Sequence, residues 1–302
     1  MKKEITLPDV LRRNGFTTNT HAFRYRLDEW KKDNGVSRNY SLEEIENSQI
    51  WHAAIGTLND PFEVFAQRNR CELNEMNHEE HFKLWAKAFA KHQVPHEYWR
   101  VASEDNLRQH YVSNEFEAKA FMYSMINKND FFSDFISDLR NITSVASFTK
   151  ICDSRLMWGY YCRGQVGFCI IYNREKLLHS RIRLDEVEYS ETQNKVNIFD
   201  YTYGYRTKTP KDVSILAKIT KFKHLDWKHE SELRSLYLLK GDEIGKGVAV
   251  KLDENCVDGV ILGSNVNDGT KRKILKLSKK MGFKVFSAAV NLDEFCIQIT
   301  EF

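Results

Sequence analysis

The chain has 302 residues, of which 42% are hydrophobic, 13% aromatic and 29% charged, and this balance excludes an intrinsically disordered chain. The formal net charge of +3 neither requires nor excludes a nucleic-acid partner. No apolar run is long enough to cross a membrane, and the N-terminal residues lack the apolar core of a signal peptide. We therefore expect a cytoplasmic protein with no membrane span.

Short strands and one helix are predicted in the first part of the chain. Ala22–Tyr25 and Ile50–Ala54 are the strands, and Ser41–Asn47 is the helix, with its serine as N-cap and Glu44 as the capping-box partner. The pattern then becomes helical over residues 77–140, where apolar residues recur at i, i+3, i+4 and i+7. We predict a helical insert there.

Strands dominate the pattern after residue 141. They are predicted at Thr143–Phe148, Val166–Tyr172, Ile182–Tyr189, Leu233–Leu239, Val257–Leu262, Phe283–Ala288 and Cys296–Ile299. Helices are predicted at Val213–Phe222 and Asp268–Met281, and Ser154–Tyr161 is either a helix or a tight turn. Strands that follow helices in blocks favour an α+β fold over an alternating α/β fold.

Two clusters of polar and aromatic residues lie in the first part of the chain. In Phe23–Arg26, strand alternation places Arg24 and Arg26 on one face and the two aromatic rings on the other. Two arginines on one face suit a phosphate clamp, but they also suit an ordinary solvated face. The second cluster, Asn59–Phe62, contains Asn-Asp-Pro, which builds turns through side-chain-to-backbone hydrogen bonds.

Two further clusters lie in the second part. Leu156–Tyr161 is rich in aromatic residues and precedes two glycines, which suits either a stacking surface or a core. In Trp227–Arg234, an extended backbone would place Glu230, Glu232 and Arg234 on one strand face. Such carboxylates either stabilise a developing cation or form an exposed ion pair that contributes little to stability.

Motifs of the best-known enzyme classes are absent from the sequence, including the GxxxxGK[ST], GxGxxG, HExxH and GxSxG patterns. None of the six cysteines forms a CxxC pair, so the sequence does not indicate a zinc or redox site. These absences argue against a P-loop nucleotide hydrolase in particular.

Taken together and in order, the clusters resemble a prokaryotic family of uncharacterised proteins, domain of unknown function 2971. The matching segments are Phe23–Arg26, Asn59–Phe62, Ser147-Phe148 with Met157, Trp158 and Tyr161, Gly164–Tyr172, and Trp227–Arg234. The resemblance extends over nearly the whole chain and covers residues 77–140 least.

That family is similar in turn to the ADP-ribosyltransferase superfamily. The resemblance implies an α+β fold with a split β-sheet core, formed as a single domain over residues 1–302 with the insert at 77–140. It implies NAD as a substrate, no metal, and Glu232 or Glu230 as the catalytic carboxylate, with Glu232 favoured because it directly precedes the apolar strand. The implied cofactor-binding residues are Arg24, Tyr25, Arg26, Asn59, Asp60, Ser147, Trp158, Tyr161 and Arg234.

These residue types suit cleavage of the bond between nicotinamide and ribose. The reaction passes through an oxocarbenium-like species, as glycoside cleavage does. A fixed carboxylate beside the ribose stabilises that positive charge, and arginine holds a pyrophosphate. Aromatic rings stack on nicotinamide.

The same resemblance implies a bacterial toxin or an anti-phage defence effector that modifies a macromolecule, with an antitoxin protein as a further partner. We expect a nucleic-acid acceptor, and RNA in particular, because Lys271, Arg272, Lys273, Lys276, Lys279 and Lys280 make one predicted helix basic. A basic helix face is also typical of an ordinary solvated surface. Two alternatives remain: a non-enzymatic nucleotide-sensing module, and a metal-dependent nuclease that uses Glu230, Glu232 and Asp60.

Overall fold

The computed structural model describes residues 5–60, 62–64, 66–99, 103–127, 129–193, 195–197, 199, 219–253 and 255–302. The chain divides into two compact units. The first unit comprises residues 1–61, 141–190 and 223–302, and the second comprises residues 62–140 and 191–222. No helix among the described residues is long and apolar enough to cross a membrane.

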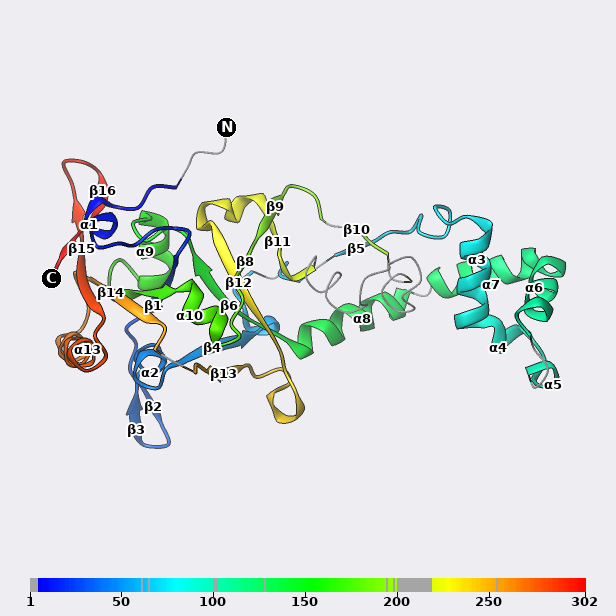
Figure 1. Ribbon diagram of the computed structural model, residues 1–302, viewed down its shortest axis with the longest axis horizontal. Helices are drawn as coiled ribbons and strands as arrows, with labels where there is room; N and C mark the ends of the chain where they lie inside the picture. Colours follow the sequence, from blue (N-terminus) through cyan, green and yellow to red (C-terminus); the bar gives the residue numbers. More distant parts are fainter. Residues whose placement is uncertain are drawn as a thin grey trace. The chain divides into compact units, whose positions relative to one another are not determined.

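A ten-stranded mixed sheet forms the centre of the first unit (Figure 1). Its main path runs β13 (Val248–Lys251), β4 (Gln49–Ala54), β6 (Thr143–Thr149), β1 (His21–Leu27), β7 (Gly167–Asn173), β14 (Val257–Gly263), β15 (Lys284–Asn291) and β16 (Cys296–Glu301). Off this path, β12 (Glu232–Leu238) pairs with β6 and with β8 (Asp185–Glu186). Only β14 and β15 are parallel in the described pairs of this sheet, so the predicted mixed α+β class is confirmed.

Helices cover both faces of this sheet, as Figure 1 shows for α9 above it and α2 and α13 below it. The helices of this unit are α1 (Asp9–Arg13), α2 (Tyr40–Glu46), α9 (Arg155–Cys162), α10 (Arg174–His179) and α13 (Asp268–Met281), with 3-10 turns η1 (Ile55–Thr57), η3 (Leu225–Glu230) and η4 (Gly241–Glu243). Along β7, Phe168 and Ile170 pack in one core with α2, α10 and α13, whereas Cys169 and Ile171 pack in another with α1 and α9. Strand alternation therefore divides the interior into two cores.

The start of α2 differs from the sequence prediction. The helix begins at Tyr40, and its N-cap is Asn39, whose side chain accepts a hydrogen bond from the Leu42 amide. Ser41 is inside the helix, so its predicted role as N-cap is wrong. The chain enters this helix from the β2–β3 hairpin (Lys31–Asp33 and Val36–Arg38). Asparagine and serine are equally good caps, and Asn39 is held at the cap position by Asp28, whose Oδ1 accepts a hydrogen bond from its Nδ2 at 2.6 Å.

Most of the other predicted elements of the first unit are confirmed to within three residues. They are β1, β4, β6, β7, β12, β14, β15 and β16, with helices α9 and α13. The continuous strand predicted over Ile182–Tyr189 is wrong, because this segment divides into β8, which pairs with β12, and β9 (Glu188–Ser190), which pairs with β11 (Phe222–His224). The helix predicted at Val213–Phe222 lies outside the described residues, except for its last four.

Helices dominate the second unit. They are α3 (His78–Leu84), η2 (Trp85–Phe89, a π-helical turn), α4 (Ala90–Gln93), α5 (His96–Trp99), α6 (Glu104–Ser113), α7 (Glu115–Asn127) and α8 (Asn129–Ile142), with a small ribbon of β5 (Gln67–Arg68) and β10 (Lys195–Val196). Asn77 and Glu80 form a complete capping box at the start of α3. Phe82, Trp85 and Tyr111 lie in one buried core. The helical pattern expected from residue 77 is thus present, and the grouping of the whole chain into one domain stays a prediction.

A buried ion pair ties α2 to the sheet on the face of the first core. The Glu44 carboxylate is 3.2 Å from Arg24 Nη2 and 3.3 Å from Arg26 Nε. Arg24 also donates to the Trp51 and Ser147 carbonyl oxygens, at 2.8 and 3.2 Å. Arg24 and Glu44 are 6% and 1% exposed, so both arginines share one face as predicted, but that face is interior rather than solvated.

Removal of the Glu44 charge should strongly destabilise the first unit. Glu44→Ala leaves two arginines near one another without their anion, and breaking a buried ion pair in this way costs about 3–5 kcal/mol. We expect a large fall in the urea midpoint of unfolding. Glu46→Ala, an exposed position on the same helix, is the control and should change stability by no more than about 0.5 kcal/mol. Equal midpoints for the two variants would contradict a structural role for Glu44.

Candidate functional site

Two glutamates converge where η3 ends and β12 begins. Glu230 is the last residue of the 3-10 turn, and Glu232 is the first residue of the strand. Between them, Ser231 takes a left-handed conformation, with φ 45° and ψ 50°, which is uncommon for a residue other than glycine. This sharp change of direction turns both carboxylates toward the same lysine.

The two carboxylates are neutralised by two cations. Lys223 Nζ lies 2.7 Å from Glu230 Oε2 and 3.2 Å from Glu232 Oε2. Arg234 binds Glu232 with two hydrogen bonds, from Nε to Oε1 at 2.7 Å and from Nη2 to Oε2 at 2.9 Å. All four side chains are at most 6% exposed. We call Lys223, Glu230, Glu232 and Arg234 the carboxylate cluster.

Hydroxyl and amide groups from neighbouring elements surround the carboxylate cluster. The Tyr161 hydroxyl on α9 donates to Glu230 Oε1 and is hydrogen-bonded to the Asn59 side chain. On β6, the Ser147 side chain is hydrogen-bonded to Glu232, and Thr149 Oγ1 donates to the Glu230 carbonyl at 2.5 Å. These contacts join four separate segments of the chain around one pair of carboxylates.

The environment keeps Glu232 ionised. Burial by itself would raise the pKa of Glu232, but the charges of Arg234 and Lys223, together with hydrogen bonds from Arg234 and Ser147, outweigh burial and lower the pKa to about 2. Burial and the neighbouring Glu230 charge raise the pKa of Tyr161, so its hydroxyl stays protonated and donates. The cluster therefore holds an ionised carboxylate, paired with two cations, together with a neutral hydrogen-bond donor.

Six of the residues predicted from the sequence are brought together here. They are Asn59, Ser147, Tyr161, Glu230, Glu232 and Arg234. The register explains part of this grouping, because Glu232 pairs with Thr149 and Arg234 with Ser147, and directly opposed residues of antiparallel strands share a face. An extended backbone, as expected from the sequence, would place Glu230 on the same strand as Glu232. In the structure Glu230 belongs to η3 and reaches the cluster from there.

The other predicted residues lie elsewhere. Phe23 pairs with Thr149, so Phe23 and Tyr25 share the sheet face of Glu232, and Arg24 and Arg26 point to the opposite face. The Tyr25 and Trp158 rings pack edge to face in the second core, 5.3 Å apart.

Asp60 is 4% exposed. The predicted cofactor contacts of Arg24, Tyr25, Arg26, Asp60 and Trp158 stay predictions.

Three residues of the site were missed from the sequence. Lys223 bridges the carboxylates, the Tyr189 hydroxyl accepts a hydrogen bond from the Glu232 amide at 2.8 Å, and Thr149 binds the Glu230 carbonyl. Each belongs to a different strand, and no spacing or motif links them to Trp227–Arg234.

The carboxylate cluster does not form part of a metal-binding group in the described residues. Across the described residues, no group of three or more His, Cys, Asp or Glu side chains is arranged to hold a metal ion. In the carboxylate cluster, the oxygens of both glutamates accept hydrogen bonds from cationic or hydroxyl groups.

Comparison with known proteins gives one family match. Residues 157–235 match a family described as "Protein of unknown function (DUF2971)". This match supports the resemblance inferred from the motifs over the segment that holds Trp158, Tyr161 and Trp227–Arg234. No curated protein and no solved structure matches the chain.

The low pKa of Glu232 predicts a loss of stability in acid. A pKa of about 2 in the folded state lies below the value of about 4.3 for an unfolded glutamate, so the ionised cluster stabilises the fold above the unfolded pKa. That contribution, on the order of 3 kcal/mol, should be lost as the pH falls from about 5 to 2.

Urea unfolding at several pH values checks this expectation. Glu232→Gln cannot titrate at this position, so the wild-type advantage over this variant should be largest near pH 7 and should shrink toward pH 2. An advantage that stays constant over that range would show that Glu232 is not held ionised by the fold.

Proposed function

We propose that the protein is an ADP-ribosyltransferase that transfers ADP-ribose from NAD to a macromolecular acceptor. The observation that carries the proposal is a buried carboxylate, Glu232, which is kept ionised next to a second carboxylate, Glu230. The family resemblance supports the choice of reaction, and its finer implication, a split-sheet core of the transferase type, is part of the proposal.

The chemistry requires a carboxylate that is ionised at neutral pH. As the bond between ribose C1′ and the nicotinamide nitrogen breaks, its electron pair leaves with nicotinamide and positive charge develops on the ribose. The Glu232 carboxylate stabilises that charge, which is absent from ground-state NAD, and so lowers the barrier rather than tightening binding. The acceptor nucleophile then attacks C1′, and its proton passes to a base, a role that the proposal gives to Glu230.

The residues of the carboxylate cluster suit ribose and phosphate. The contact between Lys223 and Glu232 Oε2, at 3.2 Å, is the longest of the four charge-assisted contacts in the cluster. In the proposal a ribose hydroxyl replaces this contact, and Lys223 turns toward the pyrophosphate. Arg234 keeps both of its bonds and continues to hold the carboxylate in place.

The biological setting follows from the resemblance alone. We propose a toxin or an anti-phage defence effector, with RNA as the first acceptor to test. The experiment is to incubate the protein with labelled NAD and cell lysate, and to determine which class of macromolecule becomes labelled.

Glu232→Gln should reduce the rate of transfer by about 10²–10³ or more, the loss expected when a group that stabilises a transition state is removed. Binding of NAD should survive, because ground-state NAD gains little from the charge. Glu230→Gln should reduce the rate less. Glu186→Gln, at an exposed carboxylate on β8, is the control and should transfer at the wild-type rate.

Thermal unfolding of each variant separates chemistry from stability, since Glu232→Gln leaves Arg234 without its anion. A larger loss in Glu230→Gln than in Glu232→Gln would exchange the two roles. If the wild-type protein binds NAD but never consumes it, the nucleotide-sensing hypothesis replaces the enzyme. Nucleic-acid cleavage that stops on addition of a chelator would favour the nuclease.

A further inference from the structure

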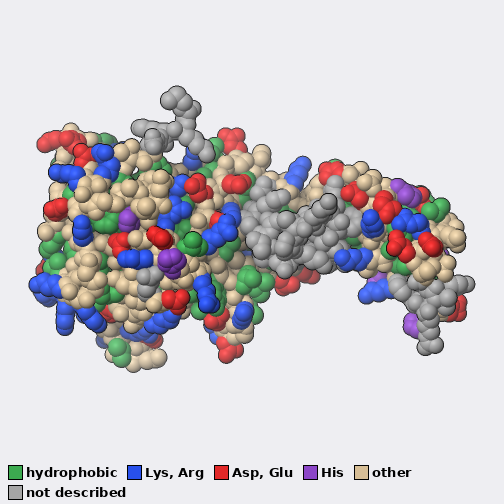
Figure 2. All heavy atoms as spheres, viewed as in Figure 1, with side chains coloured by type: hydrophobic (Ala, Val, Ile, Leu, Met, Phe, Trp, Pro, Cys, Tyr) green, Lys and Arg blue, Asp and Glu red, His purple; other side chains and the backbone are tan. Residues whose placement is uncertain are grey.

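Helix α13 carries an unusually one-sided set of charges. Successive residues of an α-helix are about 100° apart, so five of its six cations fall within an arc of about 120°. These five are Arg272, Lys273, Lys276, Lys279 and Lys280. On the opposite side, Thr270 and Ile274 are buried, and Leu277 and Met281 pack against the first core. Figure 2 shows Lys and Arg side chains gathered at the lower left, where α13 lies in Figure 1.

Within the described part of the chain, these five side chains have no acidic partner. No carboxylate among the described residues lies within 4.0 Å of any of them, although other surface cations of the protein, such as Arg108 and Lys150, have such partners. We call the five residues the basic face. An uncompensated basic face of this kind attracts a polyanion and releases its counterions.

Aromatic rings flank the helix on both sides. Lys273 Nζ lies 4.7 Å from the centre of the Trp30 ring, and Lys271 Nζ lies 4.8 Å from that of Phe302. Trp30 is 38% exposed and Phe302 is 53% exposed. Basic side chains interleaved with exposed aromatic rings are the combination by which proteins hold the phosphates and stack the bases of single strands.

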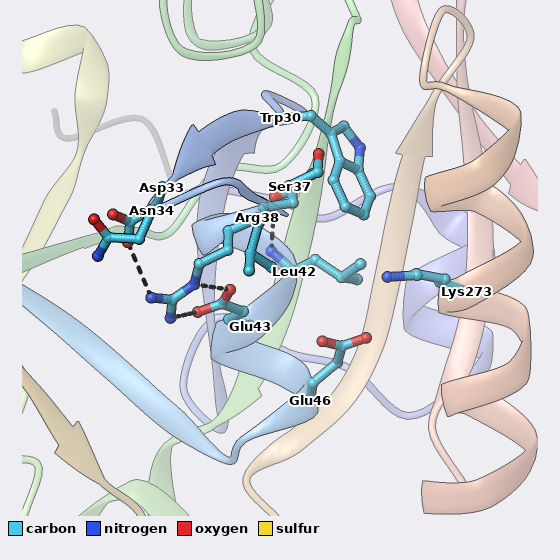
Figure 3. A pocket seen from close by; sticks show the side chains of 11 residues that line it. Trp30, Asp33, Asn34, Ser37, Arg38, Leu42, Glu43, Glu46 and Lys273 are labelled. Atoms are coloured by element: carbon cyan, nitrogen blue, oxygen red, sulfur yellow. Dashed lines mark hydrogen bonds and ion pairs between the residues drawn. The ribbon is translucent and has the colours of Figure 1, made fainter.

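A concave pocket adjoins the basic face at Trp30. Its volume is about 430 Å³, and it lies between the β2–β3 hairpin, α2 and α13 (Figure 3). Figure 3 shows the Trp30 ring and the Lys273 side chain on the α13 side of the pocket, with Glu46 projecting from α2. On the far side, Arg38 is held by Glu43 in two hydrogen bonds of 2.8 and 2.5 Å.

Asp28 fixes the two helices that form this pocket. One of its carboxylate oxygens accepts from Asn39, the N-cap of α2, at 2.6 Å and from Thr270 at 2.8 Å. The other accepts from the backbone amide of Asn267, the N-cap of α13, at 2.9 Å. Thr270 in turn accepts from Trp30 Nε1 at 3.0 Å. The ring and the basic face are therefore held on a rigid frame, which favours a preformed binding surface.

We propose that α13 and the Trp30 pocket bind single-stranded nucleic acid, with phosphates on the basic face and one base stacked on Trp30. The unpaired positive charges of the basic face favour a polyanion as the partner. The polar walls of the pocket, with Ser37 and the Glu46 carboxylate, offer hydrogen-bonding groups to the edge of a base. A lipid surface would gain nothing from a polar hollow beside the tryptophan. The proposal is independent of the transferase reaction, because binding needs no NAD.

Fluorescence anisotropy with labelled single strands of RNA and DNA, measured on the full chain without NAD, tests the proposal. Lys276→Glu with Lys280→Glu should weaken binding at least about tenfold and reduce the slope of log affinity against log salt by about 1.4, since each phosphate contact on a single strand contributes about 0.7. Lys240→Glu with Lys246→Glu makes the same change in net charge at exposed positions near η4 and should leave the slope unchanged.

A separate variant tests the proposed stacking of a base on Trp30. Trp30→Ala should weaken binding of single strands by about 5-fold to 100-fold with no change in the salt slope, and Trp30→Phe should restore most of the loss. Equal binding of RNA and DNA would show recognition of phosphate and base alone, and stronger binding of RNA would add recognition of the 2′-hydroxyl. Either result supports the proposal.

Four results would overturn the proposal. They are no binding by the wild-type protein at low salt, equal effects of the two double variants, tighter binding of duplex than of single strands with no effect of Trp30→Ala, and tighter binding of anionic phosphatidylserine vesicles than of oligonucleotides. A protein that binds single strands but never consumes NAD would leave this proposal standing and remove the transferase.

Discussion

Glu230 and Glu232 are 2% and 4% exposed, and two carboxylates cannot be buried side by side as ions unless positive charge is buried with them. Lys223 and Arg234 supply that charge. Because Lys223 lies on β11 and Arg234 on β12, the requirement for neutrality fixes where these strands and η3 meet. Hydrogen bonds of Tyr161 and Ser147 to the same two carboxylates connect α9 and β6 to this site.

The alternation of the central sheet has a second effect on the site. Glu232 and the aromatic rings of Phe23 and Tyr25 face one core, and the two arginines of β1 face the other. Glu232 and the two arginines, which the sequence motifs assign to one site, therefore lie on opposite faces of the sheet. On their own side, Arg24 and Arg26 share Glu44 as a partner, so each face of the sheet has its own buried ionic group.

The sequence predicts local structure well where a repeating pattern is long, as in β7, β14 and α13. It also singles out Trp227–Arg234, because three ionisable residues stand at the start of an apolar strand. It does not predict Lys223, whose role exists only once β11 has been placed, nor the left-handed turn at Ser231 that separates Glu230 from the strand. The choice of Asn39 over Ser41 as N-cap likewise depends on a tertiary contact, the hydrogen bond from Asn39 to Asp28. These features are set by tertiary contacts, which local propensity does not encode.

The order of the chain in the first unit has a consequence for synthesis on the ribosome. Tyr161 and Glu230 are 69 residues apart, and Thr149 and Glu230 are 81 apart, so the cluster is held by contacts between distant segments. Strands β1, β6 and β7 emerge early, yet β6 gains β12 and β7 gains β14 only after residue 230 has been made. Contacts of such long range form late and slowly. A nascent chain therefore cannot assemble the carboxylate cluster until Arg234 has been translated, and products of translation that end before Glu230 lack the site altogether.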